Sequence, residues 1–198
     1  MKLYVTPNSP YARMARIAVI EKGLERRVEI LQAQTRRADS PYYAINPSGR
    51  VPYLVRDDGV GMEESALICD YLDQLDGRPT LGLPPGWEAR RLEGLARSLV
   101  DGVSVWNREL ARPENERSPT VIRHEAERSR RMIDLWEREI GHPLMQGPLN
   151  RIHLTLACTL GLEARNPGFQ WRPGHPRLVD WHTPIAARAS FAATVPPG

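Results

Sequence analysis

The sequence predicts an α/β domain followed by an all-helical domain, and three observations lead to this prediction. All six tyrosines lie at or before Tyr71, and all five tryptophans lie at or after Trp87. Residues 77–86 contain three prolines and three glycines, which is typical of a linker. Apolar residues recur with strand and helix periods before this linker and with only the helix period after it. We therefore expect domains at residues 1–76 and 87–198.

The first domain begins with a predicted strand, helix and strand. Residues 2–6 alternate apolar and polar side chains, as a half-buried strand does. A helix follows, because Ser9 is a favourable N-cap and Pro10 suits the first helical position. Gly23 marks the end of this helix. Residues 27–31 alternate again and predict the second strand.

The rest of this domain predicts a hairpin and a helix. Residues 46–49, Asn-Pro-Ser-Gly, have the composition of a turn. Residues 53–56 and 60–62 flank Asp-Asp-Gly, which indicates two antiparallel strands. A helix then begins near Ser65. The order βαβ-ββα is that of a thioredoxin-like domain, in which a mixed four-stranded sheet is packed between helices.

The second domain predicts only helices. They are expected at residues 87–111, 118–140, 151–163 and 177–187. The third is apolar nearly all round, so we expect it to lie at the centre of the all-α domain.

Composition and charge exclude several classes of protein. No apolar run approaches the ~20 residues that a membrane-spanning helix needs, so no membrane partner is expected. The chain has no charged-then-apolar leader, and Cys69 and Cys158 lie in apolar helical patterns, so we expect a cytoplasmic protein with buried thiols. The net charge of +3 comes from arginines interleaved with glutamates, which does not indicate a nucleic-acid partner. No spacing of His, Cys, Asp and Glu indicates a metal site.

Ser9 is the first candidate site residue. A hydroxyl at a helix N-terminus can donate a hydrogen bond to an anion, and the helix dipole favours negative charge there. A thiolate held at this position would have a lowered pKa. The alternative is that Ser9 only caps the helix. No general base accompanies it in the sequence, so a hydrolytic triad is poorly supported.

Two further motifs can bind parts of a peptide-like ligand. Val51 precedes Pro52 at a strand start; if their bond is cis, the backbone of Val51 turns toward the crevice and can pair with an extended peptide. Glu64 and Ser65 stand at a helix start, where N–H groups and a hydroxyl bind a carboxylate and Glu64 can hold an ammonium group. This pair suits the α-amino acid end of a ligand. The alternative is that Ser65 is only an N-cap.

Residues 9–13, 46–54 and 64–72, which contain these motifs in this order, resemble the cytosolic glutathione transferase family. The resemblance covers essentially the whole chain, because residues 171–181 and 189–191 are similar to bacterial members. It implies that Ser9, in place of the tyrosine or cysteine of other classes, donates a hydrogen bond to the sulfur of glutathione.

The resemblance also implies how the rest of glutathione is bound. Val51, before a cis Pro52, would pair with the cysteinyl backbone. Glu64 and Ser65 would bind the γ-glutamyl end. Arg50 would lie near the glycyl carboxylate, where its planar fork suits that group.

Three more residues have implied roles at the second substrate and at a partner subunit. The acceptor site should lie between the domains, with Tyr11 and Trp106 as candidates. Packing between the domains is the alternative role for Trp106. Asp101 could face the glutathione of a partner in a homodimer.

The function implied by the resemblance is a detoxifying glutathione transferase. It would add the glutathione thiolate to a small, fairly apolar electrophile, with glutathione as a cosubstrate and no bound cofactor. The alternatives are a glutathione-dependent lyase, dehalogenase or isomerase of the same fold, and a non-catalytic protein-binding relative. Residues 7–10 lack the paired serines before a cysteine that are typical of the isomerase class.

The start of the central helix departs from the family pattern of Ser or Thr followed three residues later by Asp. Here the two positions are Asn150 and His153. Asn can still cap, but His is a poorer reciprocal acceptor than a carboxylate, and a protonated His opposes the helix dipole. We therefore expect a lowered pKa for His153 and a gain in stability from His153→Asp.

Overall fold

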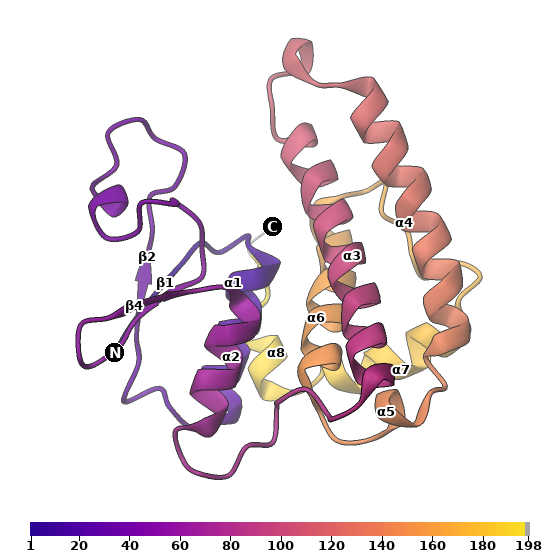
Figure 1. Ribbon diagram of the computed structural model, residues 1–198. Coiled ribbons are helices and arrows are strands. Elements are labelled where there is room, and N and C mark those ends of the chain that lie inside the picture. The colour runs from indigo at the N-terminus through magenta and orange to yellow at the C-terminus, as the bar shows by residue number, and fades with distance from the viewer. Residues whose placement is uncertain (197–198) are drawn as a thin grey trace. The chain divides into compact units, whose positions relative to one another are not determined.

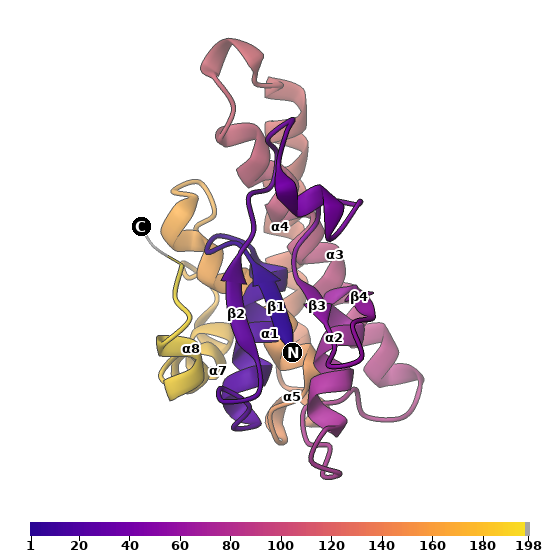
Figure 2. The same cartoon turned by 90° about the vertical axis from the view of Figure 1, so that its left-hand side faces the viewer.

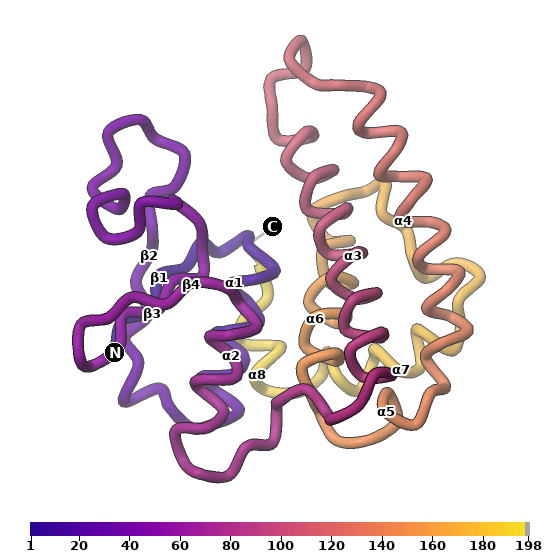
Figure 3. Tube along the Cα trace, viewed as in Figure 1, coloured from indigo at the N-terminus to yellow at the C-terminus, as the bar shows by residue number. Residues whose placement is uncertain are grey.

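The computed structural model describes residues 1–196, so the last two residues of the predicted domain 87–198 lie outside the described part. The described residues form two compact units, one built from Met1–Gly82 together with residues 189–196 and one from Leu83–Arg188 (Figure 1). The division falls within the predicted linker 77–86, through which the chain runs without a helix or strand (Figure 3). No helix among residues 1–196 is long and apolar enough to cross a membrane.

The first unit is built on a four-stranded sheet with the order β2-β1-β3-β4 (Figure 2). The strands are β1 (Lys2–Val5), β2 (Glu29–Gln32), β3 (Tyr53–Val55) and β4 (Gly61–Glu63). β1 and β2 are parallel, and the other two pairs are antiparallel, so the prediction of a mixed four-stranded sheet is confirmed. Leu3 pairs with Ile30 on one side and Leu54 on the other, and both leucines are fully buried in the core.

The two faces of this sheet are covered differently. The full helices of the unit are α1 (Pro10–Glu21) and α2 (Ser65–Gln74). They contact each other and the sheet, so they lie on the same face. On the other face, the one-turn 3-10 helix η1 (Pro41–Ala44) places the buried Tyr42 ring 5.5 Å from that of Tyr4. This turn cannot extend into a full helix, because Asn46 precedes Pro47 and a residue before proline is disfavoured in a helix.

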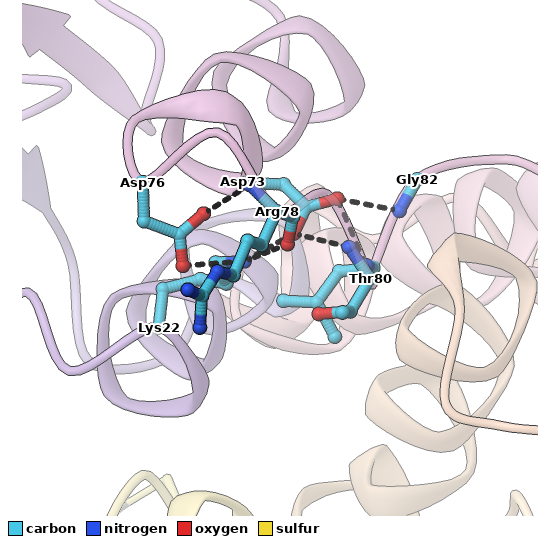
Figure 4. Close-up of polar contacts among 7 residues, drawn as sticks. Lys22, Asp73, Asp76, Arg78, Thr80 and Gly82 are labelled. Atoms are coloured by element: carbon cyan, nitrogen blue, oxygen red, sulfur yellow. Dashed lines mark hydrogen bonds and ion pairs between the residues drawn. The ribbon is translucent and has the colours of Figure 1, made fainter.

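A buried carboxylate on α2 explains why the first unit continues to Gly82. The carboxylate of Asp73 accepts hydrogen bonds from the backbone N–H groups of Thr80, Leu81 and Gly82 at 2.8–2.9 Å. Its Oδ1 also lies 3.1 Å from Nζ of Lys22, at the end of α1 (Figure 4). A buried charge is tolerated when it is paired and hydrogen-bonded in this way. The first part of the predicted linker is therefore bound to the first unit.

Residues 189–196 depart from the predicted division, which assigned them to the helical domain. They include α8 (Ala189–Ala192), which packs against α1. The buried Arg13 donates from Nε to Thr194 Oγ1 at 3.3 Å and from Nη2 to the carbonyl of Phe191 at 3.0 Å. Its guanidinium also lies over the ring of Phe191. Because a buried guanidinium needs such acceptors, this segment is part of the first unit.

The second unit is all-helical, as predicted. Its helices are α3 (Trp87–Leu110), α4 (Pro119–Glu139), α5 (Pro143–Gln146), α6 (Arg151–Leu160) and α7 (Pro176–Ala186), with 3-10 turns at η2 (Glu114–Glu116) and η3 (Gly161–Arg165). All residues of α6 are buried, and α3 packs against both α4 and α6. The prediction that the third helix is central is therefore confirmed, although its last predicted turn is the 3-10 helix η3.

The start of α6 confirms the prediction that Asn150 caps this helix, and it gives the His153 ring a partner outside the cap. Asn150 is the N-cap, and its Oδ1 accepts from the N–H groups of Ile152 at 2.9 Å and His153 at 3.4 Å. The His153 ring does not turn back toward the cap. Its Nε2 lies 3.2 Å from the carbonyl oxygen of Met145, and its ring contacts that of Trp181. Burial lowers the pKa of His153 to about 4, which is the expected direction, but the side chain has a partner of its own.

Candidate functional site

Three of the predicted motifs meet at one edge of the sheet. Ser9 follows the end of β1, and Tyr4 near that end pairs with Tyr53 at the start of the antiparallel β3. Residues 51–52 therefore approach the sheet at the same edge. Tyr53 in turn pairs with Glu63, the last residue of β4, and the third motif begins with the next residue. The strand register alone thus gathers the three motifs.

Ser9 caps α1 and keeps a proton to donate. Its Oγ accepts a hydrogen bond from the backbone N–H of Ala12 at 3.1 Å. A hydroxyl that accepts one bond still has its O–H donor, and the structure records no acceptor for that donor among residues 1–196. Helix capping and donation to an anion are therefore compatible at Ser9.

The loop before β3 is held by two residues that sequence analysis did not identify. Tyr42 Oη donates to the carbonyl oxygen of Arg50 at 2.6 Å, and Asn46 Nδ2 donates to the same oxygen at 3.0 Å. The Val51–Pro52 peptide bond that follows is cis. The asparagine at the first position of the Asn-Pro-Ser-Gly turn was a usable signal for Asn46. Nothing local in the sequence marked Tyr42. The Arg50 side chain itself is exposed.

The start of α2 has no side-chain cap. Ser65 is the first helical residue, so its alternative interpretation as a plain N-cap is wrong. Glu64 holds the cap position with φ 79° and ψ 117°, and its side chain makes no cap hydrogen bond to the first N–H groups of the helix. A non-glycine residue with positive φ costs about 1–3 kcal/mol and is often kept at a ligand site. These N–H groups, with the positive end of the helix dipole, form an anion-binding arrangement.

The remaining three candidates are placed in different units. Tyr11 is half-buried on α1. On α3, Asp101 is exposed and Trp106 is buried. The Trp106 ring lies against Gly168, where an added Cβ would be 2.8 Å from Cζ2 of the indole. Trp106 therefore packs within the helical unit, and the roles of the three residues at an acceptor site or a partner's site stay predictions.

The sequence comparisons agree with this geometry. The sequence profile of the glutathione S-transferase N-terminal domain matches residues 3–80. The whole chain is similar to the uncharacterized GST-like protein YibF of Escherichia coli K12, with 30% identity over 203 aligned positions that cover 100% of this chain and 99% of that protein. The chain belongs to the glutathione transferase family.

Solved structures extend the similarity to the full fold. A glutathione transferase family member from Pseudomonas fluorescens Pf-5, with bound glutathione, is 31% identical with a TM-score of 0.87, covering 100% of this chain and 99% of that one. A structure of a Pf-5 family member with bound S-(propanoic acid)-glutathione gives a TM-score of 0.85. Maleylacetoacetate isomerase of Pseudomonas aeruginosa is 34% identical over 84 positions, which cover 41% of this chain and 40% of that protein. The thioredoxin-like domain followed by a helical domain is thereby confirmed.

Proposed function

We propose that this protein is a glutathione transferase that adds the thiolate of glutathione to a small, fairly apolar electrophile. The observation that carries the proposal is the uncapped start of α2 at the same sheet edge as Ser9. In this proposal, Ser65 and the first N–H groups of α2 bind the γ-glutamyl carboxylate, and Glu64 pairs with the ammonium group. The Pseudomonas fluorescens relative with bound glutathione supports the choice of ligand.

The proposed chemistry depends on stabilising a thiolate. The O–H of Ser9 donates to the sulfur, and the positive end of α1 favours its ionised form. The main chain of Val51 pairs with the cysteinyl backbone, and Arg50 lies near the glycyl carboxylate. The bound thiolate then attacks an electrophile held by Tyr11 and Trp106, so thiolate stabilisation and proximity supply the rate enhancement.

The proposal also covers the oligomeric state and the cellular location of the enzyme. We propose a homodimer in which Asp101 faces the glutathione of the partner subunit. A cytoplasmic, detoxifying role agrees with a site that needs only glutathione and a reactive acceptor. Dimerisation is tested by sedimentation equilibrium at several protein concentrations, where a monomer at every concentration would contradict it.

The isomerase relative supplies the second candidate function, since its similarity covers the glutathione-binding half of the chain. Calorimetry with glutathione, followed by a panel of alkyl halides, aryl halides, epoxides and cis-enones on the same sample, separates the candidates. Conjugation of a halide or epoxide supports the transferase. Turnover of the cis-enone alone would favour the isomerase, and a lack of glutathione binding would reject both.

Ser9→Ala tests the role of the hydroxyl, and the chain offers a matched control. Ser118 also precedes a proline and caps a helix, with Oγ accepting from the N–H of Val121 at 3.3 Å. Both variants should lose a similar helix cap, about 1 kcal/mol. Only Ser9→Ala should raise the pKa of the bound thiol, by roughly one to two units, as followed by ultraviolet titration of the thiolate. An unchanged titration midpoint of the bound thiol in Ser9→Ala would show that the Ser9 hydroxyl does not stabilise the thiolate.

A further inference from the structure

The segment that leads into β3 is packed against the sheet by a pair of tyrosines. Tyr42 in η1 is buried, and its ring lies 5.5 Å from that of Tyr4 on β1. The same segment continues to Val51, which comes shortly before Tyr53, the first residue of β3. Tyr53 in turn pairs with Tyr4. The ring contact therefore fixes the start of the segment that brings the Val51 main chain to the proposed glutathione site.

Two buried side chains donate to one carbonyl oxygen in this segment. Tyr42 Oη lies 2.6 Å from the carbonyl oxygen of Arg50, and Asn46 Nδ2 lies 3.0 Å from it. Nδ2 of Asn46 also donates to Tyr42 Oη at 3.3 Å. A carbonyl oxygen has two lone pairs, so the two donors occupy both of them. Burial raises the pKa of Tyr42, so its phenol keeps the proton that it donates at neutral pH.

The N–H of Arg50 is held more weakly than its carbonyl oxygen. Ser48 Oγ accepts from this N–H at 3.2 Å and donates to Glu63 Oε1 at 2.5 Å. Both bonds are exposed, so water can replace them at little cost. Tyr42 and Asn46 are shielded from water, since they are 3% and 2% exposed. These two side chains are therefore the main determinants of how the Arg50 main chain is oriented.

The orientation of the Arg50 carbonyl group also sets that of the Val51 N–H. Both groups belong to one planar trans peptide unit, in which the C=O and N–H bonds point in opposite directions. Because the oxygen points toward Tyr42 and Asn46, the N–H of Val51 points away from them. Among residues 1–196, the structure records no acceptor for this N–H. Val51 is half-buried, and a backbone donor there without a protein partner is available to a ligand.

We propose that Tyr42 and Asn46 are positioning residues for glutathione. By holding the carbonyl oxygen of Arg50, they aim the N–H of Val51 at the carbonyl oxygen of the cysteinyl residue of the ligand. The inference rests on the proposed function, in which the Val51 main chain pairs with the cysteinyl backbone. A donor that is already oriented does not have to be ordered when the ligand arrives, and this favours binding. Neither side chain acts on the reacting sulfur in this role, so its loss weakens binding and leaves the thiolate chemistry intact.

Tyr42→Phe removes one of the two donors and keeps the ring, and Tyr4→Phe, in the contacting ring, is the matched control. The probes are glutathione and an analogue in which a trans-alkene replaces the Cys–Gly amide, so that the cysteinyl carbonyl oxygen is missing. Isothermal titration calorimetry with the full-length protein should show glutathione binding about fivefold weaker in Tyr42→Phe, with the affinity for the analogue within about twofold of the wild type. Tyr4→Phe should bind both probes as the wild type does. A variant whose site is merely damaged would lose affinity for both probes alike, and that result in Tyr42→Phe would overturn the proposal.

Two further measurements separate positioning from catalysis and from folding. The pKa of the bound thiol should be the same in Tyr42→Phe as in the wild type, whereas Ser9→Ala should raise it. In the ¹⁵N-labelled wild-type protein, which needs no substitution, the amide proton resonance of Val51 should shift downfield with glutathione and not with the analogue. A Val51 resonance that glutathione does not move, or equal glutathione affinities in Tyr42→Phe and the wild type, would overturn the inference and leave the proposed transferase standing. A wild type that does not bind glutathione would reject both.

Discussion

The starts of α2 and α6 satisfy the same physical requirement in opposite ways. Both helices begin with N–H groups that have no partner inside the helix. At α6 the buried Asn150 accepts from two of them and donates to the carbonyl oxygens of Leu144 and Pro148. At α2 the side chain of the N-cap residue Glu64 makes no cap hydrogen bond, and Glu64 holds a positive φ. The first arrangement stabilises the fold. The second arrangement costs stability but leaves the first backbone N–H groups of α2 available as hydrogen-bond donors. A ligand site requires such donors.

The substitution with the largest expected effect is His153→Asp, at the start of α6. A carboxylate there would be buried and would face the carbonyl oxygen of Met145, which already accepts from Trp181 Nε1 at 2.8 Å. We expect a loss of about 3 kcal/mol at pH 7.5, because an unpaired buried charge is costly. Urea unfolding measures it. His124→Asp, at an exposed position on α4, is the control and should change stability by less than about 0.5 kcal/mol. A stabilised His153→Asp would show that position 153 serves the cap after all.

Asn150→Ala should be the next most damaging change. It removes the acceptor for two N–H groups and leaves the carbonyl oxygens of Leu144 and Pro148 without its amide. The expected loss is about 2–3 kcal/mol, measured as a lower urea midpoint with an unchanged slope. Asn115→Ala, in the exposed turn η2, is the matched control. Equal stabilities of the two variants would mean that solvent satisfies the start of α6.

These helix starts also show which features a sequence reveals. The caps at Ser9, Ser118 and Asn150 were predictable, because each hydrogen bond joins residues two or three positions apart and depends on one residue type. The motifs at the sheet edge were predictable for a related reason. Once the strands are known, their pairing register determines which residues of neighbouring strands lie opposite each other.

Contacts between distant residues were not predictable in this way. No residue near Arg13 in the sequence indicates its partners Phe191 and Thr194, which follow about 180 positions later. The rotamer of His153 depends on Met145 and Trp181, which belong to other elements. The positive φ of Glu64 had no signal, because glutamate does not favour that conformation and only the surrounding fold imposes it.

Glu64→Gly tests whether the start of α2 lowers the stability of the fold while it contributes to glutathione binding. Glycine adopts positive φ without strain, so the variant should gain about 1 kcal/mol in unfolding free energy. It should also weaken glutathione binding about tenfold, because it loses the proposed partner of the ammonium group. Arg36→Gly is the matched control, since Arg36 also has a positive φ (63°) but lies in an exposed loop. That variant should gain stability with unchanged affinity. A Glu64→Gly variant that binds glutathione normally would show that neither the side chain of Glu64 nor its strained backbone contributes to glutathione binding.

The smallest expected effect is a pH dependence at the start of α6. Burial lowers the folded-state pKa of His153 from its ordinary 6.5 to about 4, so the folded protein holds the ring neutral. Stability from this site is therefore complete above pH 6.5 and is lost as pH falls toward 4, because the unfolded chain takes up a proton that the folded chain does not. Between pH 7.5 and 5.5 the wild type should lose about 1 kcal/mol more than His153→Gln, whose amide can still donate to the carbonyl oxygen of Met145. His124→Gln, at the exposed position on α4, should keep the full wild-type loss. Apart from His124, which only the control variant lacks, every other titrating group is shared by the three proteins, so the loss that His153→Gln alone avoids between the two pH values is due to the His153 ring. An equal loss in all three would mean that His153 takes up its proton in the folded state, and that the helix start capped by Asn150 tolerates a positive charge beside it.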